Sequence, residues 1–249
     1  HAKGETNLEG EVIAARTMNS LYIWLDIAYL MMLLGVLLWT KRRQAVIAGL
    51  IGGALYFAVD YGMFYLLLGT RQVVGADPFW FLLWLSISYG FTNFVWIWLW
   101  LDRDGHTLEW SILIVAGWLA TALLSQNFGN QFSQISIMRG TNDYHGIMAL
   151  ILVIGYGIVC IYNIRLKDKT KKIPVLWILA IGILVQFGWE FVLNITGIRN
   201  QSLQTLIVNS LLETNLGLPY LYFIHRAVHK RRDEALHKQL PDNETVFTS

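Results

Sequence analysis

Three carboxylates lie inside stretches of sequence that are otherwise apolar enough to cross a bilayer. They are Asp60, Glu190 and Glu213. An acid at the middle of a membrane helix costs about 2.5–3.5 kcal/mol on insertion scales, so three of them in one small chain require a function or a partner. Buried carboxylic acids can donate protons to apolar substrates or couple proton movement to transport, because the interior solvates their charged form poorly. We therefore place the candidate catalytic residues at these three positions.

The composition predicts an all-α, polytopic membrane protein. Apolar residues make up 55% of the 249-residue chain and charged residues 14%, compared with roughly 45–50% and 25% in soluble domains. A membrane helix needs about 20 apolar residues, and the candidate segments are 21–38, 45–68, 79–101, 110–124, 144–162, 173–195 and 206–224.

We predict a seven-helix transmembrane domain over residues 18–226, preceded by a polar segment (1–17) and followed by a charged cytoplasmic tail (227–249). The polar run 125–142 is the longest loop and the predicted lid.

Three features are set aside from the functional argument. Met18 stands just before the first apolar block, so we expect part of the segment before it to be foreign to the native chain. Cys160 is the sole cysteine, which excludes an internal disulfide and a cysteine metal site. His225 and His229 have the i, i+4 spacing of metal ligands but no acid cluster near them in the sequence. Two histidines do not make a metal site, so we interpret them as surface residues and expect neither a metal nor another cofactor.

The basic residues predict the orientation in the membrane. Fourteen of the 19 Lys and Arg residues lie in the C-terminal tail and in the loops after the first, third and fifth apolar segments. By the positive-inside rule, the N-terminus is outside and the C-terminus is cytoplasmic. The net charge of +2 then reflects topology and anionic headgroups, not nucleic-acid binding. The expected partners are the bilayer and a hydrophobic small molecule within it.

The acids are predicted to share one layer in the outer half of the bundle. At 1.5 Å per residue, each lies roughly 8–12 Å from the outer end of its helix. Gln186, Glu190 and Asn194 recur every four residues on the sixth segment, and Asn209 and Glu213 do so on the seventh. Both polar stripes are expected to face the bundle interior or a wet cavity.

The seventh segment is predicted to be irregular just beyond Glu213. Pro219 cannot donate to the carbonyl of Asn215, and Gly217 adds conformational freedom. We expect the run 213–219 to line a cavity.

The second and sixth segments carry a similar pattern. Asp60 precedes Arg71, and Glu190 precedes Arg199, by about three helical turns in both cases. This similarity indicates that helices one to three and five to seven form weak parallel repeats joined by helix four, a 3+1+3 plan. Arg71, Arg139 and Arg199 would also serve as anchors at the outer interface.

Three places in the sequence resemble a known family: Val59-Asp60 in the second segment, Glu213-Thr214 in the seventh and the run 87–90 in the third. The chain resembles the small seven-helix membrane-bound terpene cyclases of fungal meroterpenoid and indole-diterpene pathways. Those enzymes have a Trp-Glu acid in helix two, an Asp-Gly acid in helix seven and an Asn-Phe-Gly turn in helix three. The resemblance covers nearly all of 21–232 in helix count and loop length.

The resemblance implies a metal-independent cyclase that protonates a prenyl or terpenoid substrate. Asp60 or Glu213 would protonate an epoxide or terminal olefin, and a second acid or its conjugate base would take the final proton. Glu190 is our addition to this pair, from its depth and spacing. The chain departs from the family in that its Trp-Glu pair stands in helix six rather than in helix two. Aromatic faces would stabilise the carbocation. The predicted substrate-binding residues are Tyr61, Tyr89, Trp189, Asn194, Asn209, Asn215, Arg71 and Arg199.

Other classes stay open beside the cyclase. The repeat, the broken seventh helix and the acid layer would equally serve a proton-coupled carrier of a small solute, or a lipid- or ligand-binding membrane protein. The cytoplasmic half has few intramembrane polar residues, which favours a one-sided pocket. A carotenoid-type cyclase, or an enzyme on another membrane lipid whose anionic head the outer arginines hold, is a third class. A single buried acid can also be a structural partner of an Asn, a Tyr or a backbone group.

Overall fold

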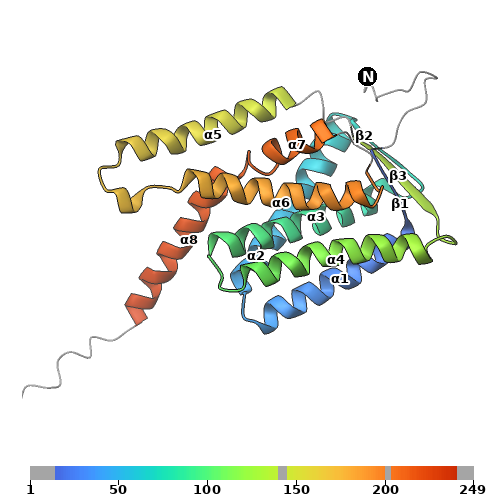
Figure 1. The fold of residues 1–249 in the computed structure, drawn as a ribbon, viewed down its shortest axis with the longest axis horizontal. Helices are drawn as coiled ribbons and strands as arrows, with labels where there is room; N and C mark the ends of the chain where they lie inside the picture. Colours follow the sequence, from blue (N-terminus) through green and yellow to red (C-terminus); the bar gives the residue numbers. More distant parts are fainter. Residues whose placement is uncertain (1–14, 140–144, 200–202, 240–249) are drawn as a thin grey trace, which may run out of the picture.

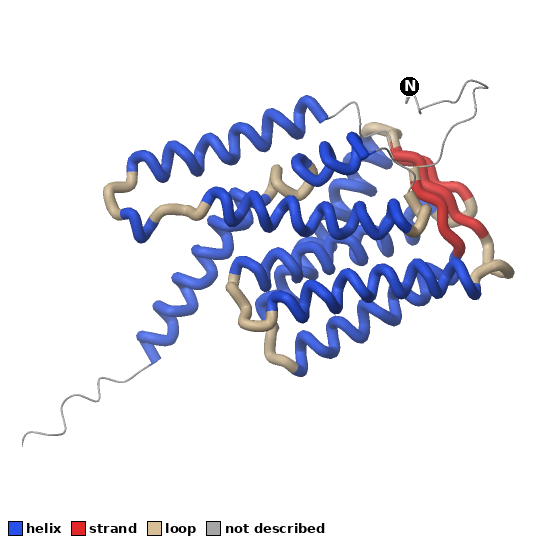
Figure 2. Tube along the Cα trace, in the orientation of Figure 1, coloured by secondary structure: helices blue, strands red, loops and turns tan. Residues whose placement is uncertain are grey.

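The computed structural model describes residues 15–139, 145–199 and 203–239, which form a helix bundle with a small sheet across one end (Figure 1). The longer helices are α1 (Ser20–Trp39), α2 (Arg43–Phe57), α3 (Pro78–Leu101), α4 (Thr107–Phe128), α5 (His145–Arg165), α6 (Val175–Ile195) and α8 (Leu218–Gln239). Helix α2 continues as a π-helix over Ala58–Leu67, Lys169–Lys171 form a 3-10 turn, and α7 covers only Leu203–Leu212. The strands are β1 (Arg16–Asn19), β2 (Arg71–Val74) and β3 (Gln134–Arg139). We call the two ends of the bundle the sheet end and the opposite end, from which α8 extends (Figure 2).

Within the described residues, six helices are long and apolar enough to cross a membrane. They are α1, α2 with its π-helical extension, α3, α4, α5 and α6. The protein is therefore a mostly helical bundle with six candidate membrane spans, in agreement with the first six predicted segments.

The predicted seventh segment, 206–224, is not one helix. Helix α7 ends at Leu212, a turn follows, and α8 begins at Leu218. The irregular stretch predicted at 213–219 is confirmed in place, but it breaks the helix completely. Helix α8 then runs through the boundary that we predicted at residue 227 and ends only at Gln239.

The expectation of an all-α protein is wrong at the sheet end. Three antiparallel strands form a sheet in the order β1-β3-β2. They come from the segment before α1, the α2–α3 connection and the α4–α5 connection. The predicted lid at 125–142 thus begins within α4 and contributes β3, and its last residues lie outside the described part of the chain. Strand β3 buries Ile135 and Ile137 on one face, which is the two-residue period of a strand. A strand of six residues shows this period too briefly to predict it firmly from the sequence.

Helix α3 lies at the centre of the bundle. Most of its side chains are buried, whereas few of those on α5 are. Helix α3 contacts α1, α2, α4, α6 and α8, so it is the element that positions the others. The exposed apolar side chains of α5, such as Ile147 and Ile154, are typical of a helix that faces lipid.

Helices α2 and α3 approach each other backbone to backbone. A Cβ atom placed on Gly90 of α3 would lie 2.7 Å from the carbonyl oxygen of Gly52 and from the Cα of Gly53 on α2. Small residues allow such approach in membrane helices, where packing takes the place of a hydrophobic driving force. This contact holds the helix that carries Asp60 against the helix that carries Tyr89.

We expect Gly90→Ala to destabilise the protein by about 1–3 kcal/mol, because the new methyl group meets backbone atoms that cannot rotate away. Chemical unfolding in detergent micelles measures the change. The matched control is Gly157→Ala on α5, where an added Cβ meets nothing within 4 Å. The control should be neutral or stabilised by up to about 1 kcal/mol through helix propensity. Equal stabilities for the two variants would contradict the close α2–α3 contact.

Candidate functional site

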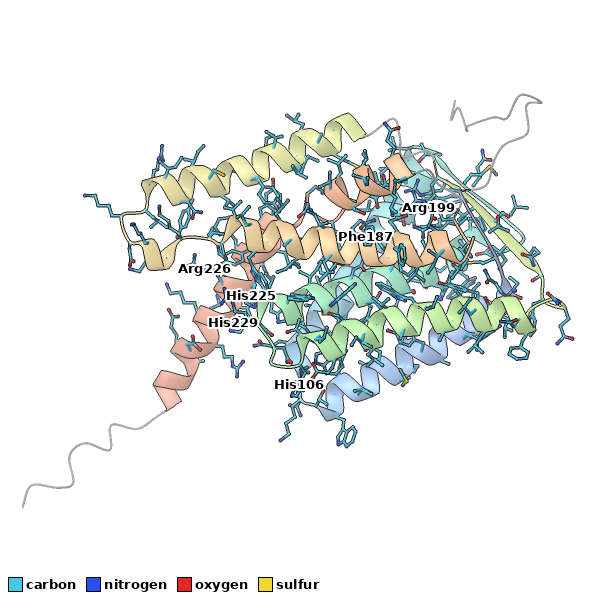
Figure 3. All side chains as sticks on the ribbon, in the orientation of Figure 1. His106, Phe187, Arg199, His225, Arg226 and His229 are labelled. Carbon is cyan, nitrogen blue, oxygen red and sulfur yellow. The ribbon has the colours of Figure 1, made fainter. Side chains whose placement is uncertain are left out.

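Two buried acids near the sheet end form ion pairs with arginines that follow their own helices. Asp60 Oδ1 accepts hydrogen bonds from Arg71 Nη2 at 2.9 Å and Nε at 3.3 Å. Glu190 Oε1 accepts from Arg199 Nη1, and Figure 3 places Arg199 near the sheet end. The sequence pattern of an acid followed by an arginine thus corresponds to the same interaction in both halves. Only this local correspondence, not a repeat of whole three-helix units, is established.

Both chain segments turn back through a glycine to make these pairs. Gly69 has φ +63° and Gly197 has φ +71°, a left-handed conformation that glycine adopts without steric cost. Asp60 itself lies in the π-helical extension of α2, where Leu68 N–H donates to Met63 O at 2.9 Å. Such i to i+5 segments are rare and occur often at functional sites.

Each strand of the sheet carries one arginine, and all three lie on the same face. Arg71 of β2 is the direct partner of Arg139 on β3, and Arg16 of β1 is opposite Ile137, two residues before Arg139. Like charges directly opposite each other destabilise a sheet. Asp60 offsets this repulsion, because its Oδ1 lies 2.9 Å from Arg71 Nη2 and 3.6 Å from Arg139 Nη2.

Arg139 lies among all three acids. Burial alone would lower the pKa of this guanidinium, but the charges of Asp60, Glu213 and Glu190 raise it above its ordinary value. From the sequence, we expected Arg139 to be an interface anchor outside the site. The alternation of apolar and polar residues in β3 is the signal that could have placed it there.

Arg16 is the most unusual cation of the cluster. Its side chain is buried, and it forms no ion pair with any residue that the structure describes. Burial and the neighbouring charges of Arg139 and Arg199 lower its pKa to about 9, and its guanidinium carbon lies 5.7 Å from the Trp189 ring centroid. The segment 1–17 was set aside in the sequence analysis, yet Arg16 and Thr17 belong to the sheet that closes the site.

Gln186 joins the other two acids into one hydrogen-bonded cluster. Its Oε1 accepts from the hydroxyls of Tyr89 at 2.8 Å and Thr214 at 2.6 Å. These two donors fix the amide, so Nε2 points toward the acids and donates to Glu213 Oε2 at 2.6 Å and Glu190 Oε1 at 3.3 Å. One side chain therefore connects α3, α6 and the turn after α7.

Aromatic rings pack directly beside this cluster. The ring centroids of Tyr89 and Tyr56 lie 4.7 Å apart, those of Tyr89 and Trp189 lie 5.2 Å apart, and those of Trp189 and Trp118 lie 4.8 Å apart. All four rings are wholly or partly buried. Their faces and edges provide an apolar wall with negative π-density next to the acids.

The structure brings together most of the predicted site residues. The acids Asp60, Glu190 and Glu213 form one connected charge cluster near the sheet end with Tyr89, Trp189, Arg71 and Arg199. Arg71 and Arg199 form ion pairs with Asp60 and Glu190. We expected both arginines to bind the substrate, and these ion pairs are a second interaction that they make.

The other predicted binding residues lie elsewhere. Tyr61 stacks on Phe57 and Tyr65 along α2 and its π-helical extension. Asn215 Oδ1 accepts from Tyr156 OH at 2.9 Å and packs where Gly182 leaves room, so it joins helices rather than the acids.

Two asparagines complete the predicted set. Asn194 is half-buried, and its carbonyl accepts from Gly197 N–H at 3.0 Å, where α6 ends. Asn209 is buried, and its Oδ1 has no hydrogen-bond partner within the described ranges.

The cluster can stabilise a negative charge, orient a carboxyl group and keep that group beside an apolar wall of aromatic rings. Asp60 and Glu190 have compensating arginines, whereas Glu213 forms no ion pair among the described residues. The arrangement therefore distinguishes the three acids, which the sequence could not do.

We expect Asp60→Asn to destabilise the protein by about 3–5 kcal/mol, because it leaves Arg71 and Arg139 buried without their shared counter-charge. The double variant Asp60→Asn/Arg71→Gln should lose less than the sum of its single variants, since it removes both members of the pair. Unfolding free energies of the four proteins close the cycle. Glu234→Gln, in an exposed i, i+4 pair with Lys230, is the control and should change stability by no more than about 0.5 kcal/mol. Additive single effects would contradict a direct Asp60–Arg71 interaction.

Comparisons with known proteins identify no relative of this chain. No protein-family model matches it, and neither a curated protein nor a solved structure gives a significant match. The resemblance to the membrane terpene cyclases stays a prediction that rests on the residues given above.

Proposed function

We propose that the protein is an integral membrane cyclase that protonates a prenyl or terpenoid substrate with Glu213 as the proton donor. The observation that carries this proposal is the unequal pairing of the acids. Asp60 and Glu190 each bind an arginine, while Glu213 accepts a single short hydrogen bond from Gln186 and has no arginine ion pair in the described part of the chain. A carboxyl group without a cationic partner is best placed to carry and deliver a proton.

The proposed reaction adds the Glu213 proton to the terminal olefin or epoxide of the substrate. Protonation of an olefin forms a C–H bond and leaves a tertiary carbocation, and protonation of an epoxide opens its C–O bond. The π-electrons of the next double bond then close a ring. Loss of a proton from a neighbouring carbon to the Glu213 carboxylate restores the enzyme; if a second carboxylate takes that proton instead, a proton must also return to Glu213 before the next turnover. The product is an isomer of the substrate, so no oxidant, reductant or metal is consumed.

The surroundings of Glu213 support carbocation chemistry. Tyr56, Tyr89 and Trp189 lie beside the cluster, and a desolvated cation over such a ring gains up to about 2 kcal/mol. The three-stranded sheet covers this end of the bundle (Figure 1). A cover of this kind would keep water away from a reactive cation.

The proposal includes a membrane topology. We infer that α7, the turn at Glu213 and the first half of α8 form a seventh crossing, with the sheet end outside and the C-terminus in the cytoplasm. The support is the basic-residue bias, since the opposite end receives fourteen of the 19 Lys and Arg residues. The two acid–arginine pairs support a parallel relation between helices one to three and five to seven.

A ligand-binding membrane protein, or an enzyme on an anionic lipid, is the second candidate. Arg16 Nε, Arg71 Nη1 and Arg139 Nε are buried and have no hydrogen-bond partner among the described residues. Three incompletely satisfied guanidinium groups on one sheet face would suit a phosphate or carboxylate head. Lipid analysis of the purified protein separates the candidates, because a bound anionic lipid favours binding and a bound neutral isoprenoid favours the cyclase. Solute movement into proteoliposomes would instead support the carrier.

The test of the cyclase is product formation in D₂O. Protein in liposomes is incubated with a prenylated phenol that carries a terminal olefin, and with its terminal epoxide. We expect a cyclised isomer, with one deuterium on carbon from the olefin substrate. Glu213→Gln should lower the rate by about 10²–10⁴-fold, the range of general acid catalysis, without a matching loss of folded protein.

The controls separate catalysis from folding. Glu109→Gln, an exposed acid near the opposite end, should leave the rate unchanged. Asp60→Asn/Arg71→Gln should keep measurable activity if Asp60 positions the site and does not supply the proton. An unchanged rate in folded Glu213→Gln would reject Glu213 as the donor.

A further inference from the structure

Two histidines and an aspartate converge at the opposite end of the bundle. His225 and His229 are one turn apart on α8, and Asp102 caps the C-terminal end of α3. The distances to Asp102 Oδ1 are 2.6 Å from His225 Nε2 and 2.8 Å from His229 Nε2. Figure 3 labels both histidines next to each other on α8, and their ring centroids lie 4.3 Å apart. The expectation that both histidines are surface residues is wrong for His225, which is buried, and Asp102 supplies the acid that the local sequence lacked.

These two hydrogen bonds also place the three groups in the arrangement of a metal-ligand set. Both imidazole Nε2 atoms point at the same carboxylate oxygen, and the three ligand atoms lie within 4.8 Å of one another. A tetrahedral ion with bonds of about 2.0–2.1 Å separates its ligand atoms by roughly 3.3 Å. Small side-chain rotations would therefore admit an ion between these three groups.

The surroundings suit a partly open site. The His225 ring centroid lies 4.9 Å from that of Trp98, which provides an apolar wall on one side. On the other side a groove of about 640 Å³ is lined by both histidines and by Asp233. Since residues 225, 229 and 233 share one face of α8, Asp233 offers a further carboxylate along the same groove.

The neighbouring cations are partly engaged elsewhere. Arg226 Nη1 donates to the carbonyl of Lys171 at 3.5 Å, and Lys230 Nζ lies 3.8 Å from Glu234 Oε1. Their charges are thus drawn toward other groups rather than toward Asp102.

We propose that Asp102, His225 and His229 bind a divalent transition-metal ion, with Zn²⁺ as the best match. Two imidazole nitrogens and one carboxylate oxygen are a common zinc ligand set, and the fourth position would open to the groove for water or Asp233. The same three-ligand type also holds other first-row ions. Because the ligands come from α3 and α8, the ion would fix the direction in which α8 leaves the bundle (Figure 1). This replaces our expectation that the chain has no metal site.

The test uses the full chain in phosphatidylcholine nanodiscs, purified without a histidine tag and stripped with EDTA. Titration calorimetry with Zn²⁺, and the visible absorption of the Co²⁺ form, should give one bound ion per chain with nitrogen and oxygen ligands. His225→Gln, His229→Gln and Asp102→Asn should each weaken binding by at least about 10–100-fold, since even the loss of an outer partner has that effect. His106→Gln is the matched control, because His106 lies exposed near this end and pairs with Glu109.

Thermal unfolding separates a loss of metal binding from a loss of folded protein. His229 is half-exposed, so His229→Gln should fold and show the same melting temperature as the wild type without metal. Zn²⁺ should raise the melting temperature of the wild type and of His106→Gln but not that of His229→Gln. Absence of stoichiometric binding to the wild type, or binding to His225→Gln and His229→Gln that is as tight as to the wild type, would overturn the proposal.

Discussion

A carboxylate removed from water needs a compensating charge or hydrogen bond, and this requirement organises the sheet end of the protein. Removing one partner of a buried ion pair costs about 3–5 kcal/mol, so Asp60 and Glu190 can lie inside the bundle only because Arg71 and Arg199 reach them. Each arginine follows the helix of its acid, and a glycine with positive φ returns the chain toward the helix. The chain therefore turns back after α2 with its π-helical extension, and after α6, for the same reason: an arginine must reach a buried acid.

The sheet extends this compensation across the bundle. Its strands come from the segment before α1 and from two connections far apart in the chain, and each brings one arginine to the face that covers the acids. Arg71 and Arg139 stand opposite each other because Asp60 lies between them, and Arg16 joins from β1. Strand pairing and acid burial therefore depend on each other, since neither the arginines nor the acids would be stable in this arrangement alone.

Some features of the site could be read from single helices. The acid–arginine spacing, the polar face of α6 at Gln186 and Glu190, and the break beyond Glu213 are local, so helical periodicity and the chemistry of Pro219 reveal them. The contributions of Arg16 and Arg139 were missed, because four- and six-residue strands carry little periodic signal. Asp102 lies 123 residues from His225, and no local pattern links them.

The sequence by itself determined that the chain is a bundle of apolar helices, where its costly acids lie and where the last helix breaks. These properties follow from composition, periodicity and backbone chemistry, which act within one segment. Only the tertiary structure decided which cation meets which acid, that Gln186 joins Glu190 to Glu213, and that Asp102 meets two histidines. Such contacts join atoms a few ångströms apart in space but remote in the chain, and folding alone brings them together.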